Sequence, residues 1–291
     1  MSDAERIASP AGGELSGRGV FSGAESSVTI RESSAGGIVF RTRSGDVPAR
    51  TSNLTDAPLH PAFTGMPPRS TNLANAGARV GTVEHVLSAL AGLGVWNAEI
   101  ETEGPEIPIA DGSSLAFAQR IRASGILPSP LDSTEPIVIR ERLEVTDGLG
   151  VIVAEPLPEG SATPCEMSYH LNYSDAGGAS LPPQSASWDG LAESYYTEIA
   201  PARTFSLLSE VEALRALGLF EGFSPKELLV LGPSGPIENE WRFENEPARH
   251  KLLDLIGDLA LAGGPIRGRI TAMRSGHALN HELARVLVQL D

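Results

Sequence analysis

A histidine and two aspartates recur at four-residue intervals in the C-terminal part of the chain: His250, Asp254 and Asp258. On an α-helix, side chains four residues apart project from the same face, one turn from each other. The opposite face is apolar and predicted to be buried, with Leu252, Leu255, Ile256 and Leu259. An imidazole and a carboxylate one turn apart are the geometry that a zinc site requires, although solvated polar faces show the same spacing.

Glu84 and His85 are a second candidate for chemistry. Neighbouring residues on a helix point about 100° apart, so they are poorly placed to bind one ion together. They can divide the work, with His85 on a metal and Glu84 acting as general base on the water that the metal activates. A catalytic zinc ion takes three protein ligands and leaves one position open for water. The alternative is structural: Glu84 as a partner of the helix dipole and His85 as a half-buried ring.

The other histidines are weaker candidates. His277 and His281 are four residues apart and form a rival pair of possible metal ligands. The Ser-Gly sequence before His277 predicts that this residue begins a helix, where its ring could instead donate to an anion. We expect His281 at the surface and expect structural roles for His60 and His170.

Bulk properties exclude several classes of function. The formal net charge of −15 argues against nucleic acid or an anionic membrane as the main partner, because both require a positive field. Cys165 is the single cysteine, so neither an internal disulfide nor a thiolate zinc cluster can form. Residues 1–14 are polar, unlike a secretory signal, and no apolar run approaches membrane-spanning length. We therefore expect a cytoplasmic protein without stable membrane insertion.

The N-terminal half reads as strands followed by a helix, a strand and a helix. Apolar periodicity predicts a helix from Thr82, which we expect to be its N-cap, to a stop at Gly94. The other predicted elements are strands at 26–30, 37–42 and 96–101, and a helix at 114–123 with Ser113 as its cap.

The C-terminal half repeats this order. A Pro-rich segment suggests a domain boundary, which divides the chain into residues 1–130 and 131–291. Residues 175–187 are rich in Gly, Ser and Pro and are expected to be loose. The predicted elements are strands at 137–139, 150–154 and 266–273, and helices at 207–217, 247–262 and 277–290. Together the two halves indicate an α+β fold.

Six segments extend this pattern over nearly the whole chain. They are Thr82–His85, Ser88–Gly94, Pro105–Ser113, Ala202–Phe205, His250–Asp258 and Ser275–Asn280. In this order they closely resemble the UDP-3-O-acyl-N-acetylglucosamine deacetylases, which perform the committed deacetylation of lipid A synthesis. The resemblance implies two similar domains, each a β-sheet with helices, packed so that the helices lie between the two sheets.

The resemblance also implies roles for individual residues. It makes His85, His250 and Asp254 the ligands of Zn²⁺, with Fe²⁺ as an alternative, and Glu84 the general base. His277 would stabilise the oxyanion and protonate the leaving amine, oriented by Asp258. Lys251 and Thr204 would contact the substrate, with Phe205 against its sugar or acyl group. The implied partner is a small UDP-sugar, and the protein is expected to be a monomer.

The chain also departs from the family where substrate is recognised. Phe21 stands at a position that is usually His, and Arg274 replaces a usual Lys. An Asn-His-Pro-like stretch reads Tyr173-Ser174-Asp175, and Phe220 and Phe223 replace small residues of an apolar passage for the acyl chain. Two alternatives therefore stay open. One is a deacetylase of another N-acetylated sugar or sugar nucleotide with a short or absent acyl chain, and the other is a non-catalytic protein that binds metal or ligand.

Overall fold

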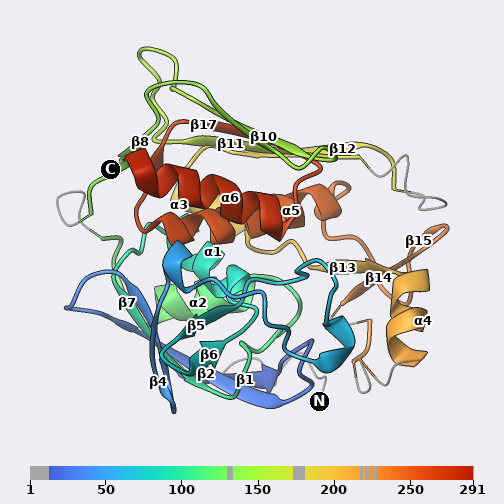
Figure 1. The fold of residues 1–291 in the computed structure, drawn as a ribbon. Helices are drawn as coiled ribbons and strands as arrows, with labels where there is room; N and C mark the ends of the chain where they lie inside the picture. The colour runs from blue at the N-terminus through green and yellow to red at the C-terminus, as the bar shows by residue number, and fades with distance from the viewer. Residues whose placement is uncertain are drawn as a thin grey trace.

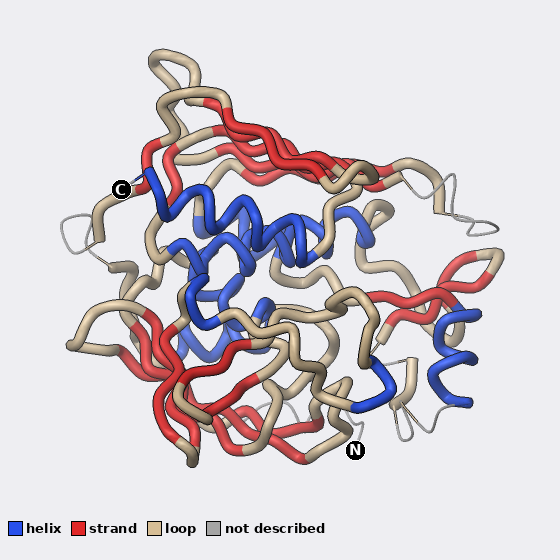
Figure 2. The backbone as a smooth tube through the Cα atoms, viewed as in Figure 1, coloured by secondary structure: helices blue, strands red, loops and turns tan. Residues whose placement is uncertain are grey.

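Two five-stranded sheets form the outer layers of the molecule, and helices fill the space between them (Figure 1). The computed structural model describes residues 13–129, 134–172, 181–216, 219, 223–225 and 228–290. The tube representation shows the same three layers, with strands outside and helices inside (Figure 2). The predicted α+β architecture, with helices packed between two sheets, is confirmed.

The first sheet has the strand order β1-β2-β7-β3-β4. Its central strand β7 pairs antiparallel with β2 and parallel with β3. Buried side chains alternate with exposed ones along β7, so that one face of this sheet packs on the helices. Its strands are β1 (Leu15–Arg18), β2 (Glu25–Glu32), β3 (Ile38–Thr42), β4 (Gly45–Pro48) and β7 (Ala98–Glu103).

The second sheet has the equivalent order, β9-β10-β17-β11-β12. Its central strand β17 likewise pairs antiparallel with β10 and parallel with β11. Its strands are β9 (Leu143–Thr146), β10 (Val151–Glu155), β11 (Glu166–Leu171), β12 (Gln184–Trp188) and β17 (Arg269–Met273). In the chain, each central strand follows one helix of the middle layer and precedes another.

The middle layer contains α1 (Glu84–Gly92), α2 (Leu115–Ala123), α5 (Glu246–Leu259) and α6 (His277–Leu287). α1 and α5 are buried almost throughout, because a sheet covers them on one side and other helices on the other. They pack at close range at Gly257, where a Cβ atom would overlap the backbone carbonyl of Glu84. This contact aligns the two helices that carry the candidate metal ligands.

A smaller unit lies beside the layers (Figure 1). It consists of β13 (Phe205–Leu207), α4 (Leu208–Ala216), β14 (Leu229–Gly232) and β15 (Gly235–Pro236). Val211 of α4 packs on Leu228 and Val230 and forms a separate small core. The remaining strands are short: β5 (Leu73–Asn75), β6 (Ala78–Val80), β8 (Ile137–Val138) and β16 (Ile266–Arg267). The remaining helical turns are α3 (Ala192–Ser194), a π-helical turn (Tyr195–Ile199) and the 3₁₀ turns Thr51–Asn53, Pro61–Phe63, Ala260–Ala262 and Val288–Leu290.

The structure corrects two local predictions. Thr82 is not the N-cap of α1: it has a φ of 56°, and its hydroxyl donates to the carboxylate of Glu106, so that the helix begins at Glu84. Residues 184–187, the end of the segment expected to be loose, belong to β12, which pairs with β11 at the edge of the second sheet.

Other predictions fall on parts of the chain that the structure does not describe. The proposed domain boundary at 130/131 and the Tyr173-Ser174-Asp175 stretch both lie outside the described residues. The boundary therefore stays a prediction. Among the described residues, no helix combines the length and the apolar character needed to cross a lipid bilayer.

Candidate active site

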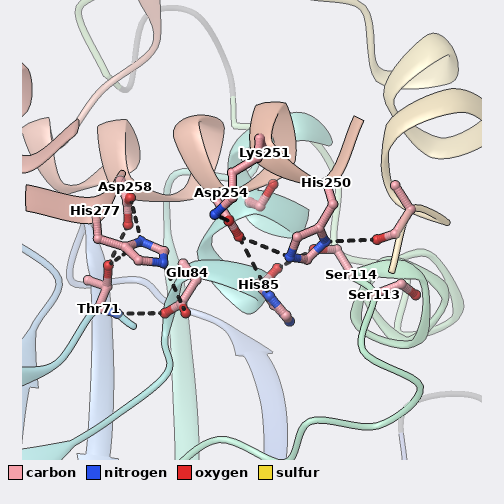
Figure 3. A network of polar contacts seen from close by, with 12 residues as sticks. Thr71, Glu84, His85, Ser113, Ser114, His250, Lys251, Asp254, Asp258 and His277 are labelled. Atoms are coloured by element: carbon pink, nitrogen blue, oxygen red, sulfur yellow. Dashed lines mark hydrogen bonds and ion pairs between the residues drawn. The ribbon is translucent and has the colours of Figure 1, made fainter. Parts of the chain in front are cut away.

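His85, His250 and Asp254 converge where α1 faces α5 (Figure 3). Their nearest potential ligand atoms all lie within 4.8 Å of one another. Asp254 Oδ1 is 3.3 Å from His250 Nε2 and 3.7 Å from His85 Nε2, and the two imidazole rings are nearly perpendicular, with centroids 5.0 Å apart. All three side chains are buried. Two imidazole nitrogens and one carboxylate oxygen around one point fit a divalent ion such as zinc.

Neighbouring groups prepare these side chains for metal binding. Burial lowers the pKa of both histidines, to about 3 for His85, which keeps the rings neutral. His250 donates its Nδ1 proton to the carbonyl of Ala202 at 3.1 Å, which leaves the Nε2 lone pair facing Asp254. Burial opposes the charge of Asp254, but His250 and Lys251 outweigh it and lower its pKa to about 2. The Lys251 ammonium lies 3.1 Å from Asp254 Oδ2.

A buried ion pair fixes the segment that supports His250. Arg203, directly after Ala202, donates to Glu246 with its backbone N–H and from its guanidinium, with Nε 2.8 Å from the carboxylate. Next in the chain, the Thr204 N–H donates to the carbonyl of Gly112 at 2.7 Å. These contacts join the Ala202–Phe205 and Pro105–Ser113 segments beside the site.

Glu84 lies at the start of α1, beside the metal-ligand cluster. Its Oε2 accepts a hydrogen bond from the backbone N–H of Thr71 at 2.9 Å. Burial raises the pKa of Glu84 to about 8, an effect that Asp258 and Asp254 reinforce and that His277 opposes. Such a carboxylate holds a proton more readily than an exposed one, which suits a general base working near neutral pH.

His277 begins α6 and faces Glu84 across the site (Figure 3). Its Nε2 is 4.0 Å from Glu84 Oε1, and its Nδ1 is 2.8 Å from Asp258 Oδ2. Burial opposes a charge on His277, but Asp258 outweighs it and raises the pKa of the ring to about 9. The same pairing holds the pKa of Asp258 well below its usual range despite burial. His277 is therefore protonated near neutral pH.

The structure contradicts the expectation that His281 lies at the surface. Its side chain is buried, and its Nε2 lies 2.8 Å from the Thr71 hydroxyl and 3.5 Å from Asp258 Oδ1. The prediction failed because α6 turns this residue toward α5 rather than toward solvent. Asn280, from the same turn, donates to Asp258 Oδ2 at 2.8 Å.

The three candidate metal ligands, Glu84 and His277 line a cavity of about 350 Å³. The residues expected to contact substrate, Lys251, Thr204 and Phe205, all line it, as does Phe21. The ion pair between Arg69 and Glu210 also borders it and joins the loop before β5 to α4 at 2.9 Å. The described residues after α4 do not include Phe220, so the predicted effect of that residue lies outside them.

Several members of this site were not predicted from the sequence. Thr71 lies in a loop without periodicity. The Ala202 group at the site is a backbone carbonyl, which the residue type cannot identify. Asn280 stands three residues after His277, on the same face of the helix, and this spacing could have identified it. Arg69 and Glu210 are 141 positions apart, and only the fold brings them together.

Comparison with known proteins agrees with the observed geometry. Residues 10–289 match the family described as UDP-3-O-acyl N-acetylglycosamine deacetylase. The chain is 38% identical to the UDP-3-O-acyl-N-acetylglucosamine deacetylase of Myxococcus xanthus, over 93% of this chain and 82% of that protein. It is 36% identical to the enzyme of the same name from Trichormus variabilis, over 94% of this chain and 95% of that protein. The chain belongs to the UDP-3-O-acyl N-acetylglycosamine deacetylase family.

Proposed function

We propose that the protein is a metal-dependent amidohydrolase that removes acetate from UDP-3-O-acyl-N-acetylglucosamine, the committed step of lipid A biosynthesis. The observation that carries this proposal is the convergence of His85, His250 and Asp254 in one cavity with Glu84 and His277. The names of the relatives support the same substrate. A cytoplasmic location and a monomeric state stay predictions.

His85, His250 and Asp254 are the groups that would hold the metal, through Nε2, Nε2 and Oδ1. A two-nitrogen, one-oxygen donor set suits Zn²⁺ and admits Fe²⁺. When bound, such an ion lowers the pKa of water and polarises an amide carbonyl. The Lys251 ammonium fixes the second oxygen of Asp254, so that Oδ1 keeps its direction toward the two imidazoles.

Glu84 supplies a base and His277 supplies an acid, and the two residues face each other in the cavity. The Thr71 N–H binds Glu84 Oε2, while Oε1 faces His277 Nε2. Glu84 takes the proton of the attacking water. His277, kept protonated by Asp258, faces the oxyanion as it develops and gives its Nε2 proton to the departing nitrogen. The separation of 4.0 Å between the two groups leaves them apart until substrate enters.

The other cavity residues are placed to recognise the sugar nucleotide. Thr204 and Lys251 offer a hydroxyl and an ammonium group at the cavity wall, and Phe205 offers an apolar surface beside them. A protein with a net charge of −15 needs local cations to attract a diphosphate, and Lys251 and Arg69 are placed there. We assign substrate contact to Thr204, Lys251 and Phe205.

A second candidate is a deacetylase whose substrate carries a short acyl chain or none. Phe21, which lines the cavity, packs edge to face against Phe63, with centroids 5.3 Å apart. They join an apolar cluster with Leu214 and Leu219, against which Phe223 packs. We infer that this cluster limits the apolar space available to an acyl chain beside α4. A non-catalytic binding protein is disfavoured, because binding alone needs neither the base nor the acid.

Two measurements test these proposals. Metal analysis of the purified protein should find about one tightly held zinc or iron ion per chain. Protein that stays metal-free on titration with zinc would contradict the proposed chemistry. Acetate release should then be compared between UDP-N-acetylglucosamine and its 3-O-acylated forms of increasing chain length. Activity that requires the long-chain form supports the first candidate, and activity confined to short or unacylated forms supports the second.

A further inference from the structure

The Thr71 hydroxyl and the His281 ring lie next to Asp258, and neither group has a part in the mechanism above. Thr71 is fully buried and His281 is 6% exposed. The Thr71 hydroxyl lies within hydrogen-bond distance of Asp258 Oδ1 and of His281 Nε2, and its backbone N–H donates to Glu84. One residue therefore contacts both the base and the aspartate that orients the acid.

Hydrogen-bond donors can be assigned in this network. Asp258 is ionised, so both of its oxygens accept. Oδ2 accepts from His277 Nδ1 and Asn280 Nδ2, and the Thr71 hydroxyl gives its single proton to Oδ1. The Thr71 oxygen can then only accept from His281, which requires a proton on His281 Nε2. His281 thus orients the hydroxyl toward Asp258.

We propose that Thr71 and His281 are positioning residues of this active site. They hold Asp258 and Glu84 in fixed positions, so that the acid, His277, and the base, Glu84, face the same bound substrate. This inference rests on the proposed function. His281 acts through the Thr71 hydroxyl, and Thr71 acts through Asp258 and Glu84. Neither residue touches the reacting atoms.

The proposal predicts a specific change in acidity when the hydroxyl is removed. Asp258 then loses a donor in a buried setting, so its charge holds the proton of His277 more tightly. The titratable groups around His277 are Asp258 and Asp254 on α5, Glu84 and His85 on α1, and His281 on its own helix. Since Thr71 itself is uncharged, its removal leaves their number unchanged. His277 becomes a weaker acid, and the alkaline limb of the kcat/KM profile moves to higher pH.

The kinetic test uses matched pairs of variants. We expect Thr71→Val to lower kcat about tenfold and to raise the alkaline limb, while Thr71→Ser, which keeps the hydroxyl, stays near wild type. His281→Leu should show the same shift, and His281→Gln, which keeps a donor, should restore it in part. The double variant should lose no more kcat than Thr71→Val alone, because His281 acts only through the Thr71 hydroxyl. His170→Leu, on β11 of the second sheet and away from the site, is the control for loss of a histidine.

Two further measurements distinguish a positioning role from a folding defect and from an error in the proposed reaction. Metal content and melting temperature show whether each variant is intact. ¹⁵N NMR of the wild-type imidazoles should find His281 protonated at Nε2, whatever substrate the protein uses. An Nδ1–H tautomer of His281, wild-type pH profiles in Thr71→Val and His281→Leu, or multiplicative losses in the double variant would each overturn the proposal.

Discussion

The backbone carbonyl of Glu84 packs directly against the α-carbon of Gly257. Any side chain at Gly257 would overlap this carbonyl, so the two central helices approach each other as closely as their backbones allow. The contact lies one residue before His85 on α1, and on α5 it lies three residues after Asp254 and one before Asp258. Helix spacing at this point therefore sets the distances between the proposed metal ligands.

Substitution of Gly257 should disturb both stability and metal binding. We expect Gly257→Ala to cost about 1–3 kcal/mol of unfolding free energy, because α1 and α5 must separate to admit the methyl group. Metal affinity should fall with it, which denaturation and metal titration would measure. Gly17→Ala is the control, since its Cβ would meet only ordinary van der Waals contact with Pro108. Unchanged metal affinity in a folded Gly257→Ala protein would show that the spacing tolerates movement.

Loss of the base should separate turnover from metal binding. Glu84→Gln keeps the shape of the side chain but cannot accept a proton from water, so we expect kcat to fall by about 10²–10⁴. Metal content, measured by elemental analysis, should stay at the wild-type level. If the metal were lost instead, Glu84 would be a ligand and the assignment of base and ligands would be wrong.

The acid should define the alkaline limb of activity. In the proposed mechanism His277 donates a proton, so activity needs its charged form and should decline as the pH rises through its pKa of about 9. Asp258→Asn removes the charge that raises this pKa, and the limb should then move to lower pH. This direction is opposite to the one expected for Thr71→Val. A pH profile of kcat/KM with the same alkaline limb in wild type and Asp258→Asn would contradict the role of this pair.

Loss of the buried ion pair between Arg203 and Glu246 should lower the free energy of unfolding more than loss of an exposed ion pair of equal length. Glu246→Ala leaves the Arg203 guanidinium buried without its carboxylate and should cost about 3–5 kcal/mol. Glu193→Ala removes the partner of Arg122 at the same 2.8 Å distance, but Glu193 is 75% exposed, so at most about 1 kcal/mol should be lost. Chemical denaturation of both variants would compare the two values, and equal losses would argue against a supporting role for Glu246.

The sequence predicted those parts of the site that depend on local spacing. His250 and Asp254 share a helix face because they are four residues apart, and periodicity alone predicts this. The approach of His85 to them depends on how α1 packs against α5, and only the family resemblance anticipated it. Thr71 could not be identified, since its role follows from where a loop passes over α1. His281 was placed wrongly because a polar residue was assumed to face solvent.

The equivalent strand orders of the two sheets have a consequence for how the site is assembled. α1 and α5 precede the matching central strands β7 and β17, so they occupy corresponding places in two units of the same topology. One unit contributes Glu84 and His85, and the other contributes His250 and Asp254. The candidate site therefore straddles a pseudo-symmetric seam, and either unit in isolation would hold only half of it.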